Sequence, residues 1–350
     1  VDIPEGTTAC VFIKSAPRVG LARQCAAMNA TIVYDVLDSK PSYKELRKTV
    51  ESPFARVVVK KDGRVEWDDG DWTLPEVDIV LTQTVAQADL IRHYDTGAVA
   101  LFHQHTNPGY HREELSHVNP VQSVTILVGN YQNIPSDEDL RRLTDSVCGA
   151  GDSVRVLQVL DHDRTKTDTR AHDKLRTYAC PGRPKMKRVA QDACDAGVED
   201  EPVLYNQETF HSSPVVCATD VALLWPPNYE MYTLQRPPTR LLYWMSHGVP
   251  AIFYPYNSYV ELARTHNYTL PNGEIPQAPN PSNVRRLLRI LVESSAARIH
   301  LARHGLDIAA KYTTAAVARR LLHVLDEYRH HGTTFLERLD NFDMFGPHLA

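Results

Sequence analysis

Short apolar runs recur along the chain, and helical patterns separate them. Such runs are typical of strands that are buried on both faces of a parallel sheet, because no position of the strand faces water. Strands that alternate with helices predict a doubly wound α/β fold. The predicted strands are 10–14, 31–36, 77–81 and 98–102 in the first part of the chain, a hairpin over 57–67, and 124–128, 154–160, 203–205, 221–225 and 251–254 in the second part.

The pattern starts again after Asn119 and Pro120, which predicts a domain boundary there. A chain of 350 residues is long enough for two domains of ordinary size. We expect a Rossmann-like N-terminal domain over 1–120 and a Rossmann-like C-terminal domain over 121–330, with a tail over 331–350. The tail either returns to the N-terminal domain or covers the second one. Helices are predicted at 282–295, 296–311 and 314–329, where apolar residues recur at helical spacing.

Composition is that of an ordinary globular protein, with 43% hydrophobic and 23% charged residues. No apolar run approaches the ~20 residues that span a bilayer, so no transmembrane segment is expected. The net charge of −5 argues against a general nucleic-acid binder. The chain starts VDIPEG, without Met or a signal-peptide pattern, so we expect a trimmed end, and a removed targeting segment stays open. We expect a cytoplasmic protein.

The six cysteines are scattered and form no CxxC pair, which predicts reduced, structural thiols and no zinc site. Two Asn-x-Thr triplets, at Asn29 and Asn267, match the acceptor pattern for N-glycosylation. Triplets of this kind also occur by chance, so the sequence alone does not decide whether they are used.

The stretch 220–262 contains the residues that say most about function. A buried strand is followed by a polar loop and by the helix start Arg236-Pro237-Pro238-Thr239-Arg240, and that helix stops at Gly248. The helix N-terminus follows the carboxyl end of a strand, where open α/β sheets bind ligands. Unpaired N–H groups, the Thr239 hydroxyl and two guanidinium groups favour an anion at this point.

This stretch resembles the nucleotide-sugar-binding segment of GT-B glycosyltransferases, in which "KPxTK" opens a helix that ends in "GVPxI" and a glutamate follows. The matching positions are Arg236, Pro237, Thr239, Arg240, Gly248, Val249, Pro250, Ile252 and Glu261. The resemblance implies two Rossmann-like domains that face a cleft. It also implies a UDP- or GDP-linked sugar on the second domain, held by Arg236, Thr239, Arg240, Ser258, Tyr259 and Glu261, and a carbohydrate or glycoconjugate acceptor on the first. Glu261 would accept from ribose hydroxyls, or would simply favour a helix start.

One departure from the family pattern concerns catalysis. Retaining families with this segment carry two glutamates, and the matching positions here hold Gln235 and Tyr243. The second domain therefore offers no evident base. Histidine is the natural general base near neutral pH, which makes His105, and then His103, the candidates at the end of a first-domain strand. The same His-x-His could be half of a metal site.

Basic loop residues are candidates for phosphate or acceptor contacts. They are Lys14, Ser15 and Arg18 in the first strand–helix loop, and Arg164 and Lys166 in the charged segment 161–169. A solvated loop is the alternative for both groups. We expect no metal or other cofactor, because basic side chains and a helix N-terminus can neutralise a leaving diphosphate. Asp161-His162-Asp163 and Asp69-Gly70-Asp71 match the metal-binding Asp-x-Asp pattern formally.

The sequence thus predicts a metal-independent glycosyltransferase that uses a nucleoside diphosphate sugar. Two other classes stay open. One is a non-catalytic binding or scaffold protein on a degenerate GT-B fold, which the missing glutamate pair motivates. The other is a GT-B sugar epimerase, which the fold alone does not separate from a transferase.

Overall fold

The chain divides into two compact units in the computed structural model. The first unit comprises Val1–Gln104, Leu234–Pro237 and Thr314–Ala350, and the second comprises His105–Thr233 and Pro238–Thr313. Each unit is described by itself. The structure describes residues 3–13, 19–35, 57–59, 65–67, 78–84, 98–101, 120–127, 135–154, 156–163, 172–182, 219–226 and 237–332.

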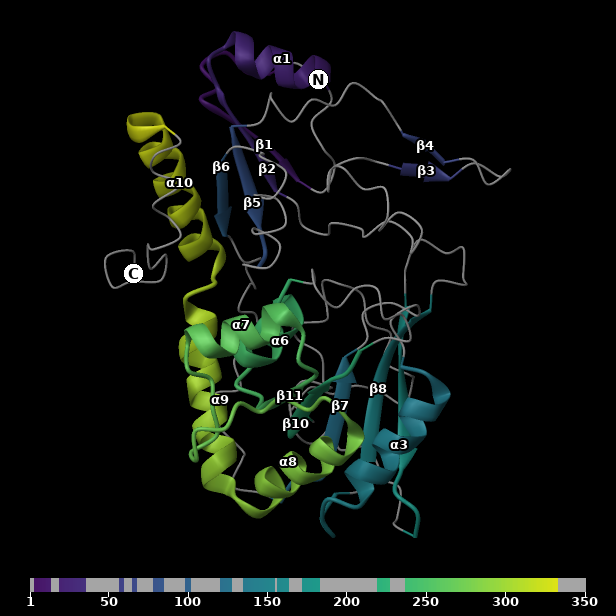
Figure 1. The fold of residues 1–350 in the computed structure, drawn as a ribbon. Coiled ribbons are helices and arrows are strands. Elements are labelled where there is room, and N and C mark those ends of the chain that lie inside the picture. The colour runs from purple at the N-terminus through teal and green to yellow at the C-terminus, as the bar shows by residue number, and fades with distance from the viewer. Residues whose placement is uncertain are drawn as a thin grey trace. The chain divides into compact units, whose positions relative to one another are not determined.

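The first unit is built on a parallel sheet with the strand order β1-β2-β5-β6 (Figure 1). All four strands were predicted from their apolar runs, and helix α1 links the first two. The antiparallel pair β3-β4 confirms the predicted hairpin, with Val57 opposite Trp67. The bounds are β1 Ala9–Ile13, α1 Val19–Ala27, β2 Thr31–Asp35, β3 Val57–Val59, β4 Val65–Trp67, β5 Ile79–Thr82 and β6 Ala98–Leu101.

Strand β2 shows why this sheet needs cover on both faces. Successive side chains of a strand point to opposite faces, and both faces of β2 are apolar. Ile32 packs in a cluster with Ala22 and Cys25 of α1. Its neighbour Val33 packs with Ile79 and Leu81 of β5 and with Val324 and Leu325 of the C-terminal helix α10 (Thr314–His331). Helix α1 therefore covers one face and α10 the other.

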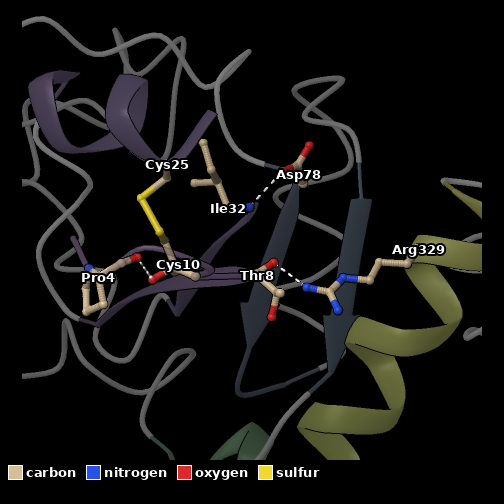
Figure 2. Close-up of a disulfide and its surroundings, with 8 residues drawn as sticks. Pro4, Thr8, Cys10, Cys25, Ile32, Asp78 and Arg329 are labelled. Atoms are coloured by element: carbon tan, nitrogen blue, oxygen red, sulfur yellow. Dashed lines mark hydrogen bonds between the residues drawn. A yellow bond between two sulfur atoms is a disulfide. The ribbon is translucent and has the colours of Figure 1, made fainter. Parts of the chain in front are cut away.

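Polar contacts add to the attachment of α10. The Asp78 carboxylate accepts a hydrogen bond from the Ile32 backbone N–H at 2.7 Å and one from the Tyr328 hydroxyl at 3.3 Å. Arg329 donates to the carbonyl oxygen of Thr8, just before β1 (Figure 2). The structure thus groups α10 with the first unit, whereas the sequence-based division placed these residues in the second. The boundary expected at 120 adjoins residues 102–119, which lie outside the described residues.

Two disulfides correct the expectation of reduced thiols. Cys10 of β1 is bonded to Cys25 of α1 (Figure 2), and Cys148 is bonded to Cys180. Sequence spacing did not signal either pair, because the partners meet only once strand and helix have packed. Cys194 and Cys217 lie outside the described residues.

The second unit is built on a sheet with the strand order β11-β10-β7-β8-β9 (Figure 1). Neighbouring strands are parallel except β9, which is antiparallel to β8. The Asp220 carboxylate accepts hydrogen bonds from the backbone N–H groups of Gln122 and Ser123, at 2.8 and 3.0 Å, and so ties the start of β10 to β7. The bounds are β7 Ser123–Leu127, β8 Val156–Asp163, β9 His172–Ala179, β10 Val221–Leu224 and β11 Ala251–Phe253.

Strand β9 is the element that sequence analysis missed. Its residues HDKLRTYA are mostly polar, as suits an edge strand, and they follow a charged stretch that we interpreted as a loop from Asp161. Strand β8 instead continues through Asp163, which pairs with His172. The Asp161-His162-Asp163 triplet thus lies within an antiparallel ladder.

Helices of the second unit form as the sequence predicts. Gly248 ends α6 with a φ of +66°, a conformation that glycine adopts without strain, and its N–H donates to the Met245 carbonyl. Helix α9 approaches α6 closely, since a Cβ on Gly305 would lie 3.2 Å from the Met245 side chain. The bounds are α3 Asp137–Cys148, α6 Thr239–Ser246, α7 Asn257–Thr265, α8 Pro281–Glu293 and α9 Ser295–Ala310. No helix among the described residues is long and apolar enough to cross a bilayer.

The attachment of α10 predicts unequal effects for the same substitution at two of its leucines. Leu325 is buried against the first sheet, whereas Leu322 is 65% exposed. Leu325→Ala should lower the free energy of unfolding by about 2–5 kcal/mol because it leaves a cavity. Leu322→Ala should change it by less than about 0.5 kcal/mol. Urea denaturation followed by circular dichroism measures both, and equal effects would contradict the packing described.

Candidate functional site

The candidate site of the second unit lies where β10 and β11 end. The two strands are parallel neighbours, with Leu224 opposite Phe253, so their carboxyl ends meet at one edge of the sheet. Helix α6 follows β10 and helix α7 follows β11. Each helix begins at this same edge, because a crossover helix runs antiparallel to its strands. Two helix N-termini therefore direct their partial positive charge to one edge.

The first turn of α6 is arranged to favour an anion. Pro238 is the N-cap residue and supplies no side-chain hydrogen bond to the helix, and the first turn contains no acidic side chain. Thr239 and Arg240 follow and are both half-buried. Backbone N–H groups, a hydroxyl and a guanidinium group are the donors that a phosphate requires.

The first turn of α7 contains a buried hydroxyl without a partner. Tyr256 is the N-cap residue, no side chain caps the helix, and the first turn again lacks an acidic residue. Ser258 is 1% exposed, and within the described part of the chain no hydrogen-bonding group reaches its Oγ. The same holds for the indole N–H of Trp225, which directly follows β10. Buried polar groups are normally paired, and for these two groups at one sheet edge the described residues supply no partner.

An aromatic chain runs along the same edge. The Trp225 ring lies 5.7 Å from Tyr254, Tyr254 lies 5.4 Å from Tyr256, and Tyr256 lies 5.1 Å from Tyr259, each as centroid distances with an edge-on geometry. Tyr254 is only half-buried, whereas the other three rings are buried. The cluster joins the end of β11 to the start of α7, and Tyr254 stays partly exposed.

The structure brings together five of the six donor-binding residues expected from the resemblance. Thr239 and Arg240 lie at the start of α6, and Ser258, Tyr259 and Glu261 lie in the first two turns of α7. Tyr259 is 2% exposed and packs on Phe253, so its ring is part of the core. Glu261 is half-buried. The sixth residue, Arg236, lies outside the described residues.

A second group of polar side chains lies at the carboxyl edge of the first sheet. Asp35 is the last residue of β2 and is half-buried. The Gln83 side chain, which follows the neighbouring strand β5, donates from Nε2 to the Asp35 carboxylate at 3.1 Å. Gln83 is 1% exposed, and Thr82 and Thr84 on either side are fully buried. Sequence analysis did not single out these residues, although a carboxylate that ends a buried strand is a usable signal.

Burial changes the acidity of this carboxyl group. Desolvation raises the pKa of Asp35 from 3.8 to about 6, and the Gln83 hydrogen bond opposes this rise. Burial also raises the pKa of the neighbouring Tyr34 to about 12, and the Asp35 charge adds to that shift. A carboxyl group with a pKa near neutrality can exchange a proton under ordinary conditions, and such groups are common at functional sites.

The remaining candidates lie outside the described residues. They are the candidate bases His103 and His105, and the candidate phosphate or acceptor contacts Lys14, Ser15, Arg18, Arg164 and Lys166. Within the described ranges, no three His, Cys, Asp or Glu side chains are placed to hold a metal ion. Asp69 and Asp71 also fall outside these ranges, so metal independence stays a prediction.

Comparison with known proteins gives information on the fold. No protein-family model matches the sequence. No curated protein matches it either. Among solved structures, HepE of Anabaena in complex with UDP superposes with a TM-score of 0.51 at 10% identity, over 87% of this chain and 75% of HepE.

Two further solved structures are similar at lower scores. WaaG, a glycosyltransferase involved in lipopolysaccharide biosynthesis, matches with a TM-score of 0.46 at 14% identity, over 84% of this chain and 79% of its own. The pneumococcal O-GlcNAc transferase GtfA, in complex with UDP and GlcNAc, matches with a TM-score of 0.45 at 11% identity, over 91% and 57%. What the chain shares with HepE at this identity is the fold. The resemblance to GT-B glycosyltransferases that the sequence indicated is thus confirmed at the level of the fold.

Proposed function

We propose that this protein is a glycosyltransferase that takes a sugar from a nucleoside diphosphate sugar without a metal ion. The observation that carries the proposal is the edge formed by β10 and β11, where two helices begin without side-chain caps and where the described residues offer the buried Ser258 hydroxyl no hydrogen-bond partner. The donor would bind there through Thr239, Arg240, Ser258 and Glu261. Arg236 completes the set by resemblance. The UDP carried by HepE, a protein of the same fold, supports a nucleotide at a site of this kind.

The chemistry that this edge favours is departure of a diphosphate. In the transfer, an acceptor hydroxyl oxygen bonds to C1 of the sugar, and the bond from C1 to the diphosphate oxygen breaks with its electron pair. Negative charge grows on the leaving nucleoside diphosphate. Helix N-termini and the Arg240 guanidinium stabilise that charge without having to reorganise, which is how fixed donors lower a barrier. The hydroxyl proton must go to a base or to the leaving phosphate.

Asp35 joins His105 and His103 as a candidate for that base. In this proposal the first unit binds the acceptor. Asp35 lies at the carboxyl edge of the first sheet with a pKa raised to about 6, so it is mostly ionised at pH 7 and still basic enough to take a proton. The two histidines follow β6 in the chain.

The proposal is tested by measuring turnover of a panel of UDP- and GDP-sugars. The expected result is release of nucleoside diphosphate from one UDP- or GDP-sugar, at a rate that a carbohydrate acceptor increases and that a chelator leaves unchanged. Nucleotide binding without any release would favour the scaffold class. Release with a rearranged sugar and no need for an acceptor would favour the epimerase class. Loss of turnover with chelator, restored by magnesium or manganese, would overturn metal independence.

Ser258→Ala should weaken nucleoside diphosphate binding by about 0.5–1.5 kcal/mol, the scale of one neutral hydrogen bond. It should leave the free energy of unfolding unchanged or raise it, because the described residues of the free protein give the Ser258 hydroxyl no hydrogen bond to lose. Ser246→Ala is the matched control, since the Ser246 hydroxyl is buried and donates to the Tyr243 carbonyl at 2.7 Å. The control should lower stability and leave affinity intact. Calorimetry and urea denaturation separate the two effects, and the same pattern in both variants would contradict a ligand at Ser258.

Arg240→Ala should weaken nucleoside diphosphate binding by about 1.5–3 kcal/mol, because it removes a hydrogen bond to a charged group. Arg264→Ala is the control, since Arg264 is exposed in the last turn of α7, away from the N-terminus. Isothermal titration calorimetry on the two variants measures the difference. Unchanged affinity in Arg240→Ala would place the diphosphate elsewhere.

Asp35→Asn should abolish the base while keeping an acceptor for Gln83. If Asp35 is the base, transfer falls by about 10²-fold or more with donor affinity nearly intact, and the parent rate rises with pH through about 6. The stability of the parent should change with pH in the direction opposite to its transfer rate. The folded pKa lies above the unfolded value of 3.8, so the parent loses stability relative to the variant as pH rises from about 4 to 6.

Measurement of transfer rate and unfolding midpoint from pH 4 to 8 checks both halves. His105→Ala and His103→Ala are assayed beside Asp35→Asn. Full activity in Asp35→Asn together with a large rate loss in one histidine variant would assign the base to that histidine. Full activity in all three would leave the proton to the leaving phosphate.

A further inference from the structure

Four of the six cysteines are oxidised in pairs, and both pairs join separate elements of the fold. Cys10–Cys25 links strand β1 to helix α1 across 15 residues, and Cys148–Cys180 links the end of α3 to the residue after β9 across 32 residues. Cys25 and Cys180 are 1% and 2% exposed. Disulfides of this structural kind form and persist in oxidising compartments and are rare in the cytosol. They argue against the cytoplasmic location expected from the sequence.

Both Asn-x-Thr triplets present their asparagine to solvent. Asn29 and Asn267 are exposed, and each lies in the turn that follows a helix, α1 and α7 respectively. Within the described residues neither carboxamide takes part in a hydrogen bond, and only their backbone N–H groups donate, to Ala26 and Arg264. A carboxamide in this position is accessible to a modifying enzyme, and a large substituent on it would project into solvent.

Backbone conformation gives a competing explanation for asparagine at these two positions. Both residues have a φ of +54°, the left-handed region in which asparagine is enriched and which commonly ends a helix. That explanation accounts for the asparagine and says nothing about a threonine two residues later. Thr31 and Thr269 complete the acceptor pattern at both sites. The disulfides supply the independent observation, because the lumen of the endoplasmic reticulum both oxidises cysteines and carries out N-glycosylation.

We propose that this chain is a secretory-pathway protein that carries N-linked glycans on Asn29 and Asn267. In the modification the side-chain nitrogen of asparagine bonds to C1 of an oligosaccharide that a lipid diphosphate carries. The bond from C1 to the diphosphate oxygen breaks with its electron pair, the lipid diphosphate leaves, and the amide nitrogen gives up one proton. The proposal is independent of the donor site, since neither asparagine belongs to it.

The first experiment is expression of the full chain behind a signal sequence in animal cells, followed by intact mass analysis before and after peptide N-glycosidase treatment. The expected result is two glycans, with both asparagines converted to aspartate by the enzyme. Thr31→Val and Thr269→Val should each remove one glycan, whereas Thr31→Ser and Thr269→Ser should keep both. These variants leave the left-handed asparagines in place, so loss of a glycan is not confused with strain at Asn29 or Asn267.

The second experiment asks where the natural protein resides. The protein is isolated from its natural source after alkylation of free thiols in intact cells, and its mass is measured before and after reduction. Protection of Cys10, Cys25, Cys148 and Cys180 together with occupied asparagines supports the proposal. Alkylation of these four cysteines without reduction overturns it. Intact disulfides with both asparagines bare also overturn it, and would indicate an oxidising compartment without N-glycosylation.

Discussion

The parallel strands are buried on both faces, and this constraint decides where the polar groups of the candidate sites lie. Strands β10 and β11 contain no charged residue, and β2 contains one only at its last position, Asp35. On these inner strands a charged group therefore lies only where a strand begins or ends. At the amino edges the charged groups hold strands together. Asp78 and Asp220 directly precede strands and accept hydrogen bonds from backbone N–H groups of neighbouring strands. The candidate sites lie at the carboxyl edges.

The two carboxyl edges differ in the charge they favour. In the second unit, helix N-termini without acidic first turns accumulate positive potential beside half-buried Arg240. In the first unit, a half-buried carboxyl group with a pKa near 6 sits beside the Gln83 amide. One edge is suited to hold a dianion and the other to accept a proton.

Most of the fold could be predicted because its signals are local. The apolar runs at 221–225 and 251–254 predict β10 and β11, and Gly248 predicts where α6 ends. Features that depend on distant partners could not be predicted. The helical pattern at 314–329 shows that α10 has an apolar face, and nothing in it identifies the sheet that it covers. The Cys10–Cys25 pair and the Asp35–Gln83 contact likewise exist only after β1, β2 and β5 assemble, and polar β9 lacks the apolar run that marks the inner strands.

The placement of α10 has a consequence for biosynthesis. The first sheet uses strands that end at Leu101, and the helix that covers one of its faces begins at Thr314, which is 314 − 101 = 213 residues later. At about 5–20 residues per second, a ribosome needs roughly 10–40 s to supply that helix. Throughout this interval α10 is not yet there to cover the apolar face of Val33, Ile79 and Leu81, as it does in the described part of the finished chain. The second unit, whose strands and helices all precede Thr314, can close first. The strands of the amino-terminal sheet are thus made early, and α10 covers them only after the second unit has been made, so this apolar face is one to which a chaperone could bind in the meantime.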